Sequence, residues 1–434
     1  MNNNNMNTYI LSAPEQLRAT VTLPASKSIS NRALIIYALS GCRQLPANLS
    51  DCDDTEVIIR ALETMPEVID IKAAGTAMRF MTAMLAATSH PSPLTSHLLT
   101  GTERMKHRPI KVLVDALRRL GADISYAGEE GFPPLRISGR QLEGGLLEVA
   151  GNISSQYISA LLLIGPVLKR GLTLRLTGDI ISRPYIDLTL CTMRDFGADV
   201  EWTDVDTIEV KPKPYEPRPY LIENDWSAAS YWYEMVALSP DIDAEVRLEG
   251  LMDGSRQGDS SVRYIFSLLG VKTTFSGDGE RMVTLRKSGH RVSRLDYDFT
   301  NAPDLAQTIV CTCCALGVPF HFTGLQTLKI KETDRIEALK TELRKLGYEL
   351  HDKDNRELSW DGTKHPTPAT VPDASASVSQ PPLIDTYDDH RMALAFAPLS
   401  LVMPISINKP QVVSKSYPQF WQHLAAAGFE ITEQ

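Results

Sequence analysis

The chain has 434 residues, of which 43% are hydrophobic and 22% are charged, and its formal net charge is −9. This length predicts two to three domains, and the composition is that of a folded globular protein rather than of a disordered, collagen-like or coiled-coil chain. The excess of acidic groups repels polyanions, which argues against a nucleic acid as a partner.

The cysteines and the apolar runs indicate the compartment. There are six cysteines, too few for a disulfide framework, and no Cys-x-x-Cys pair suited to zinc occurs among them. The N-terminus lacks the basic start and apolar stretch of a signal peptide. Apolar runs such as Tyr157 to Leu168 are shorter than the roughly 18 residues of a membrane span. We therefore expect a cytoplasmic protein that does not enter a membrane.

Two kinds of helical segment alternate along the chain, beginning with one that is apolar on nearly every side. Six segments of this first kind start at Lys27, Gly75, Ser154, Trp226, Pro303 and Asp388. Helices of this type are usually buried. Residues between them alternate with a period of two, as at Leu172, Leu174 and Leu176, which predicts strands around the helices.

The six segments of the second kind are amphipathic and mostly end at a glycine. In one of them apolar residues lie at helical spacing from Val112 to Leu120, and Gly121 supplies the left-handed residue that ends a helix. We expect each of these helices to be half-buried. Together the two kinds predict six α/β repeats in two domains of three.

Spacing and composition place the irregular parts of the chain. The first two repeats begin only 48 residues apart, at Lys27 and Gly75, whereas the later starts are 72 to 85 residues apart. One repeat is therefore expected to be shortened, with a strand pair missing between Asp54 and Ala73. The Pro-rich stretch from Asp206 to Asp225 is the expected domain boundary, and Gly362 to Pro382 is an expected insertion loop.

Basic residues gather at the predicted helix starts, although the whole chain is acidic. A helix N-terminus already carries a partial positive charge, so cations there predict bound anions. Taken singly, each residue could be a solvated or cap-adjacent charge, and each serine nearby could be only a helix cap. The basic residues are Lys27, Arg32, Arg79, Arg108, Lys331, Arg335, Arg391 and Lys415, and the serines are Ser28, Ser154, Ser155 and Ser182.

Acidic residues occur in the same places. Asp304 and Glu332 stand at helix starts, where complementing the helix dipole is the alternative to a chemical role. Two further clusters, at Asp51 to Asp54 and Asp388 to His390, lack a recognised metal-ligand spacing, so no metal is expected. Neither a GxxxxGK[ST] loop nor a GxGxxG turn after a strand occurs, which argues against a nucleotide-binding fold.

Several separate motifs, in order, resemble the 5-enolpyruvylshikimate-3-phosphate synthase family. The resemblance runs from about Leu23 to the C-terminus. The motifs are KSISNR from Lys27, AGTAMR from Ala74, LTGTERMKHRPI from Leu99, SSQ from Ser154, SRPYIDLT from Ser182, PD at Pro303, KETDR from Lys331, DDHRMA from Asp388, and VSKSYP around Lys415.

This resemblance implies a fold and a reaction. The fold would be the two-domain enolpyruvyl transferase fold, an inside-out α/β barrel with three βαβαββ repeats in each domain. One domain would span 1–22 plus 226–434 and the other 23–225, with the active site in the cleft between them, closed by substrate. The enzyme would transfer the enolpyruvyl group of phosphoenolpyruvate to the 5-hydroxyl of shikimate 3-phosphate by addition and elimination. It would act as a monomer without cofactor, metal, nucleic acid or membrane.

The resemblance also implies a role for each matching residue. Asp304 would be the base at the 5-hydroxyl and Glu332 the proton donor to phosphoenolpyruvate, with Lys27 and Lys415 as further acid/base or charge-stabilising groups. Phosphoenolpyruvate would be held by Lys27, Gly75, Arg108, Gln156, Arg335, Arg391 and Lys415. Shikimate 3-phosphate would be held by Lys27, Ser28, Arg32, Ser154, Ser155, Gln156, Ser182, Tyr185, Asp304 and Lys331.

Three positions depart from the family pattern and leave alternatives open. Ala73 and Phe80 replace the usual Asn and Pro around the second motif, and Thr327 replaces a common Asn before KETDR. Ala73, Phe80 and the shortened repeat allow a catalytically impaired anion-binding homologue as an alternative. The sister transferase that acts on UDP-N-acetylglucosamine is a weaker one, because its reactive Cys is absent from the loop Gly101 to Arg108.

Overall fold

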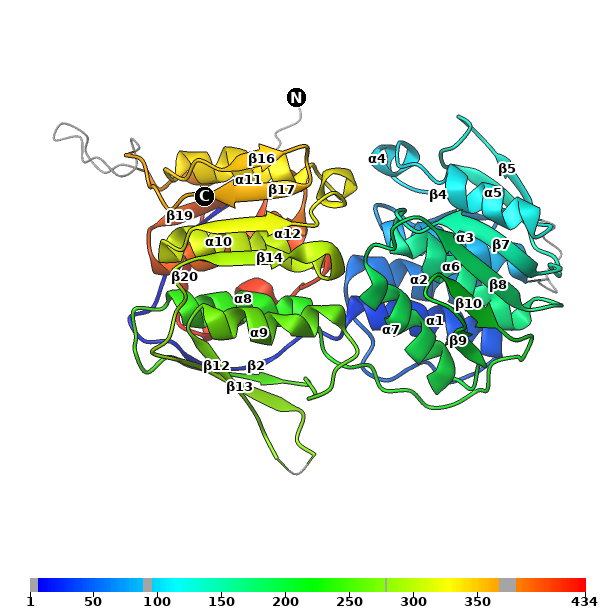
Figure 1. Ribbon diagram of the computed structural model, residues 1–434, viewed down its shortest axis with the longest axis horizontal. Helices are drawn as coiled ribbons and strands as arrows, with labels where there is room; N and C mark the ends of the chain where they lie inside the picture. Colours follow the sequence, from blue (N-terminus) through cyan, green and yellow to red (C-terminus); the bar gives the residue numbers. More distant parts are fainter. Residues whose placement is uncertain (1–6, 89–95, 278, 367–379) are drawn as a thin grey trace. The chain divides into compact units, whose positions relative to one another are not determined.

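The computed structural model describes residues 7–88, 96–277, 279–366 and 380–434. The chain forms two compact units, which we call unit 1 (Met1–Pro24 and Asn224–Gln434) and unit 2 (Ala25–Glu223) (Figure 1). The chain therefore passes between the units twice, at 24/25 and 223/224, each two residues from the boundaries expected from sequence.

Five four-stranded sheets share one topology. The first two strands of each sheet pair in parallel, and the third and fourth in spatial order each pair antiparallel to their neighbour. In unit 1 the sheets are β2 (Arg18–Thr22), β11 (Glu245–Glu249), β13 (Met282–Lys287), β12 (Val271–Phe275); β14 (Leu295–Asp298), β15 (Phe320–Thr323), β17 (Glu357–Trp360), β16 (His351–Lys353); and β18 (Leu383–Ile384), β19 (Ile405–Asn408), β1 (Thr8–Ser12), β20 (Glu430–Glu433).

Unit 2 contains the other two sheets, built in the same order. They are β3 (Val68–Asp70), β4 (His97–Thr100), β6 (Leu135–Ser138), β5 (Asp123–Tyr126); and β7 (Gly145–Ala150), β8 (Leu172–Thr177), β10 (Thr207–Val210), β9 (Val200–Trp202). Two helices join the strands of each repeat, so the βαβαββ repeat is confirmed. Period-two burial is also confirmed in β8, where Leu172, Leu174 and Leu176 are buried.

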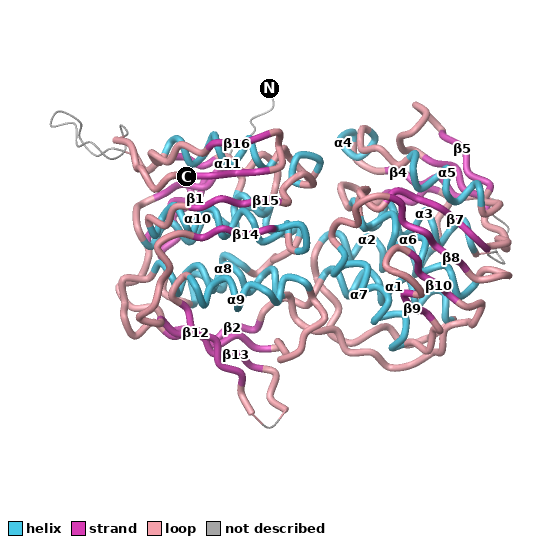
Figure 2. The backbone as a smooth tube through the Cα atoms, viewed as in Figure 1, coloured by secondary structure: helices cyan, strands magenta, loops and turns pink. Residues whose placement is uncertain are grey.

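The helices of the first kind form the interior of their units. In α3 every residue except Thr76 is buried, and in α12 all seven residues are. In unit 2, α3 packs against α6 and α1, and in unit 1, α10 packs against α8 and α12. Figure 2 shows strands along the outside of these helices within each unit. The buried helices are α1 (Lys27–Ser40), α3 (Gly75–Ala87), α6 (Ser155–Ile164), α8 (Trp226–Leu238), α10 (Ala306–Leu316) and α12 (His390–Phe396).

The helices of the second kind are amphipathic and lie with one face on the core. In α5, Leu113, Val114, Ala116 and Leu117 are buried, and Gly121 follows with φ of 100°. They are α2 (Asp53–Thr64), α5 (Lys111–Arg119), α7 (Arg183–Asp195), α9 (Val262–Leu268), α11 (Arg335–Lys345) and α13 (Phe420–Ala426), and the short α4 (Glu103–Lys106) precedes α5.

The remaining repeat, which contains α1 and α2 and contributes none of the five sheets, is shortened as expected. Among the described residues 41–52 and 65–74, the only strand is β3, which belongs to the next sheet. A single parallel bridge between Ala47 and Leu221 occupies the place of the parallel strand pair. The antiparallel pair of the other five repeats is therefore absent from this described part of the chain.

Other expectations concern the cysteines, the loop and the helices. All six cysteines are free, and Cys52, Cys311, Cys313 and Cys314 are buried. Of the expected loop Gly362 to Pro382, residues 367–379 lie outside the described residues. No helix in the described ranges is long and apolar enough to span a bilayer.

Candidate active site

In unit 2 the starts of the buried helices α3 and α6 meet, and a cation opens the neighbouring α1. The amide of Gln156, at the start of α6, donates a 3.1 Å hydrogen bond to the hydroxyl of Thr76 at the start of α3. Lys27, the first residue of α1, pairs with Asp54 of α2 at 3.4 Å. The half-buried side chains of Ser154 and Ser155 lie at the same helix start as Gln156. The N-termini of α3 and α6 therefore add positive potential where they meet.

Arg108 lies against Gly75 with no room for a side chain between them. A Cβ built on Gly75 would be 2.6 Å from one terminal nitrogen of Arg108 and 2.9 Å from the other. Arg79 supports this arrangement, because its guanidinium donates to the carbonyls of Gly75 and Pro109, each at 3.1 Å. Gly75 thus lets a guanidinium approach the first turn of α3, where the backbone N–H groups have no partner within the helix.

Arg32 is buried within α1. Its guanidinium donates to the carbonyls of Ser28 (2.8 Å) and Tyr185 (3.1 Å). It also donates to the hydroxyls of Thr189 (2.7 Å) and Ser159 (3.2 Å). Burial lowers the pKa of Arg32 to about 10, so it stays charged at neutral pH. These bonds make Arg32 a support that fixes the backbone of two candidate ligand residues.

In unit 1 a single guanidinium, that of Arg335, joins three carboxylates. Arg335 opens α11 and is 1% exposed. It donates to Asp304 (3.1 Å), to Glu332 (2.9 Å) and, through two nitrogens, to Asp389 (2.7 and 3.3 Å). Burial alone would lower the pKa of Arg335, but the charges of Asp389, Glu332 and Asp304 raise it above its ordinary value. The sequence brings these groups together from the starts of α10, α11 and α12.

Asp304 is surrounded by cations. Besides Arg335, its carboxylate pairs with Lys331 at 3.4 Å and with Arg391 at 3.1 Å. Arg391 also donates to the backbone carbonyl of Asp304 at 3.0 Å and to the hydroxyl of Tyr231 at 3.4 Å. Burial raises the pKa of Tyr231 to about 12, so this hydroxyl stays neutral. Two arginines and a lysine around one carboxylate form a site that an anion could share.

Lys415 contacts the residue pair that precedes α12. Its ammonium donates to the backbone carbonyl of Asp388, whose carboxylate pairs with Lys409 at 3.1 Å. Asp389 caps α12 by accepting the backbone N–H of Arg391 at 2.9 Å. Asp54 and Asp389 belong to the two acidic clusters that the sequence analysis considered as metal ligands. In the structure Asp54 pairs with Lys27 and Asp389 pairs with Arg335.

Local geometry corrects one expectation about helix positions, that of Lys415, and bears on the alternative that the serines are helix caps. Lys415 ends the 3-10 turn Pro410–Lys415 and does not stand at a helix N-terminus. Ser28 lies inside the first turn of α1, so it is not a cap. Ser182 precedes α7 with a left-handed φ of 54° and makes no side-chain cap bond, whereas Ser154 does cap α6.

Sequence reasoning missed Asp389 and Tyr231 as site residues. Asp389 is fully buried and holds both Arg335 and the N–H of Arg391. Its position directly before a buried helix, within DDHRMA, was a usable signal of a cap. Tyr231 lies in the middle of α8, and no local sequence pattern connects it to Arg391.

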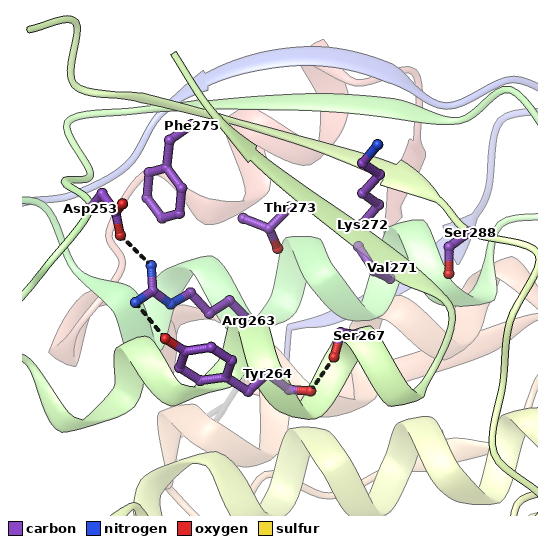
Figure 3. Close-up of a pocket in the computed structure, with 9 residues that line it drawn as sticks. All are labelled: Asp253, Arg263, Tyr264, Ser267, Val271, Lys272, Thr273, Phe275 and Ser288. Atoms are coloured by element: carbon purple, nitrogen blue, oxygen red, sulfur yellow. Dashed lines mark hydrogen bonds and ion pairs between the residues drawn. The ribbon is translucent and has the colours of Figure 1, made fainter. Parts of the chain in front are cut away.

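A separate depression lies on unit 1, away from these residues. It has a volume of about 560 Å³ and is lined by Asp253, Arg263, Tyr264, Ser267, Val271, Lys272, Thr273, Phe275 and Ser288, none of them a predicted site residue. Figure 3 shows its guanidinium held between Asp253 and the hydroxyl of Tyr264, with distances of 2.6 and 2.8 Å. We do not assign it to the site.

Comparison with known proteins first defines the class. The structure superposes on an EPSP synthase from Acinetobacter baumannii with a TM-score of 0.74 at 21% identity, covering 98% of this chain and 100% of the other. It superposes on the enolpyruvyl transferase NikO from Streptomyces tendae with a TM-score of 0.70 at 15% identity, covering 99% of each chain. The fold is the two-domain enolpyruvyl transferase fold.

Sequence comparison then gives the family. The family model for EPSP synthase (3-phosphoshikimate 1-carboxyvinyltransferase) matches residues 11–69 and 62–424. A 3-phosphoshikimate 1-carboxyvinyltransferase of Bacteroides fragilis is 59% identical over 98% of each chain. One from Haemophilus influenzae is 33% identical over 93% of this chain and 95% of the other. The chain belongs to the EPSP synthase family.

Proposed function

We propose that the chain transfers the enolpyruvyl group of phosphoenolpyruvate to the 5-hydroxyl of shikimate 3-phosphate and releases phosphate. The relatives that support this activity carry its name and extend over nearly the whole chain. The observation that carries the proposal is the buried guanidinium of Arg335, which holds Asp304 and Glu332 together beside Arg391 and Lys331. Two carboxylates among fixed cations suit a reaction that moves protons between anionic substrates.

The two carboxylates divide the acid and base work. Asp304 takes the proton of the 5-hydroxyl as the oxygen attacks C2 of phosphoenolpyruvate, and Glu332 gives a proton to C3. The resulting tetrahedral ketal phosphate then expels phosphate, and the Glu332 carboxylate takes back a proton from the methyl group, which gives the enol ether product. Lys27 and Lys415 serve as further charge-stabilising or acid/base groups.

The binding groups are those that the resemblance to the family implies, and their charges suit the two substrates. Both substrates carry a phosphate and a carboxylate, so several cations are needed to offset their mutual repulsion. Phosphoenolpyruvate is held by Arg108, Arg335, Arg391, Lys415, Lys27, Gln156 and the backbone of Gly75. Shikimate 3-phosphate is held by Ser28, Ser154, Ser155, Gln156, Ser182, Tyr185, Lys27, Lys331 and Asp304, with Arg32 fixing the backbone of Ser28 and Tyr185.

These groups are divided between unit 1 and unit 2, so the reaction needs both. We propose that the substrates bind in a cleft between the units and close it, with the protein acting as a monomer in the reducing cytoplasm. No cofactor or metal takes part in the proposed steps. Monomeric behaviour is checked by light scattering of the full chain, for which we expect the mass of a single 48.0 kDa chain.

Phosphate release tests the proposed function. The full chain is incubated with phosphoenolpyruvate and shikimate 3-phosphate, and phosphate is measured by a coupled assay. We expect release that requires both substrates, and no release when UDP-N-acetylglucosamine replaces shikimate 3-phosphate. Tight calorimetric binding of both substrates without phosphate release would instead identify a catalytically impaired homologue, and release with the nucleotide sugar would identify the sister transferase.

A further inference from the structure

The backbone carbonyl of Pro109, the residue after Arg108, is held by side chains from two different helices of unit 2. The hydroxyl of Tyr157, in the first turn of α6, donates a hydrogen bond of 2.5 Å to this carbonyl. The guanidinium of Arg79, in α3, donates a second bond to it at 3.1 Å. A carbonyl oxygen has two lone pairs, so these two donors together satisfy it.

The backbone on either side of this carbonyl is fixed as well. The N–H of Ile110, which belongs to the same peptide group, donates to the carbonyl of Gly131 at 2.8 Å. The N–H of Arg108 donates to the carbonyl of Met105 at 3.0 Å. The ring of Pro109 also restricts its own φ and the conformations open to the residue before it. The segment that carries the Arg108 side chain is therefore held at three backbone groups.

The two donors to Pro109 also contact each other. The guanidinium carbon of Arg79 lies over the ring of Tyr157, 5.5 Å from the ring centroid. Both side chains are buried, with exposed fractions of 4% for Arg79 and 8% for Tyr157. Through its other terminal nitrogen Arg79 donates to the carbonyl of Gly75, the residue against which Arg108 lies. Arg79 and Tyr157 thus join the loop of Arg108 to the starts of α3 and α6.

We propose that Tyr157 is a positioning residue for Arg108, acting together with Arg79 through the carbonyl of Pro109. Arg108 carries its charge at the end of a long side chain, and a guanidinium that bonds an anion must be held to within about 0.5 Å of its productive position. Fixing the backbone from which that side chain starts narrows the positions it can take. This inference rests on the proposed function, in which Arg108 holds phosphoenolpyruvate.

Tyr157→Phe tests the proposal with a small change. It removes the hydroxyl that bonds Pro109 and keeps the ring over which Arg79 lies. We expect KM for phosphoenolpyruvate, measured by phosphate release at saturating shikimate 3-phosphate, to rise about threefold to tenfold. The value of kcat should change by less than about twofold, because the lost interaction is one of binding. KM for shikimate 3-phosphate should also change by less than about twofold, because the loop of Arg108 carries none of its proposed ligands.

Tyr215→Phe is the matched control. The buried hydroxyl of Tyr215 also donates to a backbone carbonyl in unit 2, that of Leu163 in α6, at 2.8 Å. Each variant therefore loses one hydrogen bond between a buried tyrosine and a carbonyl, and each should lower the unfolding temperature by roughly 2–4 °C. Only Tyr157→Phe should raise KM for phosphoenolpyruvate.

A double-mutant cycle shows whether Tyr157 acts through Arg108. Arg108→Gln removes the charge whose position is at issue, and it should itself raise KM for phosphoenolpyruvate. If the hydroxyl of Tyr157 serves only to place that charge, adding Tyr157→Phe to Arg108→Gln should raise KM further by less than about twofold. Such non-additivity is expected of residues that act on one interaction, and a general loss of stability would not produce it.

The outcomes separate this inference from the proposed function. An unchanged KM for phosphoenolpyruvate in Tyr157→Phe would overturn the inference and leave the transferase activity intact. An equal rise in Tyr215→Phe, or the same fold-rise when Arg108 is already replaced, would overturn it as well. If the unmodified protein released no phosphate, the proposed function would fail. The calorimetric affinity of the same variants for phosphoenolpyruvate, with shikimate 3-phosphate present, would then decide the role of Tyr157.

Discussion

At the scale of residues, the candidate catalytic groups are also each other's counter-charges. Asp304 balances three cations, and Arg335 is buried among three carboxylates. Removing one member leaves a desolvated charge without its partner, which costs several kcal/mol. Substitutions that keep the shape and a hydrogen-bonding atom therefore separate chemistry from folding better than truncations to alanine do.

Glu332→Gln applies this principle to the proton donor. A glutamine retains an oxygen that can accept the 2.9 Å bond from Arg335, but it has no proton to give to carbon. We expect kcat to fall by about 10²–10⁴ while substrate binding changes by only a few-fold. The matched control is Glu337→Gln, an exposed acid in the first turn of α11, the helix that Glu332 precedes by three residues. Equal kcat for Glu332→Gln and the unmodified protein would contradict the assignment.

Gly75→Ala tests the contact with Arg108. The new methyl group would lie 2.6 Å from a guanidinium nitrogen, so Arg108 must move. Losing one charge-assisted bond of about 1.5–3 kcal/mol predicts a KM for phosphoenolpyruvate raised roughly tenfold or more, with little change in unfolding temperature. Gly128→Ala is the control in the same unit, because its Cβ would make only an ordinary 3.5 Å contact with Pro134. Similar KM values for the two variants would refute the contact.

Asp259, which is buried in the 3-10 turn Gly258–Ser261, predicts a stability effect through a pKa that burial raises. Because it is raised to about 6 from an unfolded value near 3.9, the folded state binds the proton more tightly, and this contribution is lost as pH rises between those values. Asp259→Asn lacks that loss. Its unfolding free energy relative to the unmodified protein should therefore increase from pH 4 to pH 7 by up to about 3 kcal/mol, measured by urea titration. A difference independent of pH would show that Asp259 has an ordinary pKa.

At the scale of elements, amino-acid patterning predicts the buried helices and their order, but not every position at their ends. The apolar segments at Gly75 and Trp226 became buried helices because no side could face water. Lys415 was misplaced, since the 3-10 turn around Pro410 has no helical period to read. The contact of Tyr231 with Arg391 spans 160 residues of sequence, and only the packing of α8 near α12 creates it.

The cap of α12 is predicted to be a major source of stability in unit 1. Asp389→Asn keeps an acceptor for the N–H of Arg391, but it leaves the buried Arg335 with less compensating charge. Breaking a buried pair predicts a loss of about 3–5 kcal/mol in unfolding free energy. Tryptophan fluorescence is a suitable probe, because Trp226, Trp232, Trp360 and Trp421 all lie in unit 1.

The control for this loss is Asp253→Asn, which breaks the exposed ion pair with Arg263 (Figure 3). An exposed pair contributes about 0–1 kcal/mol. Equal losses of unfolding free energy in the two variants would contradict the predicted contribution of the buried network around Arg335 to stability.

At the scale of the whole molecule, repeat spacing predicted more than any single residue did. The 48-residue interval between Lys27 and Gly75 indicated a shortened repeat, and among the described residues of that repeat the strand pairing is reduced to the bridge of Ala47 with Leu221. Local patterns do not show which strand β2 joins: it directly precedes α1 of unit 2 in sequence but pairs with β11 inside unit 1, as the bounds implied by the resemblance (1–22 plus 226–434) predict. Long-range pairing of this kind leaves no local pattern in the chain.

The central claim is that residues of both units act on the same pair of substrates. It is tested most directly by a crystal structure of the full chain with shikimate 3-phosphate and phosphoenolpyruvate, using Glu332→Gln to slow turnover. We predict Lys27 and Arg108 of unit 2 and Arg335 and Arg391 of unit 1 around one pair of ligands. Ligands held by one unit alone, with the cations of the other directed into solvent, would contradict the account.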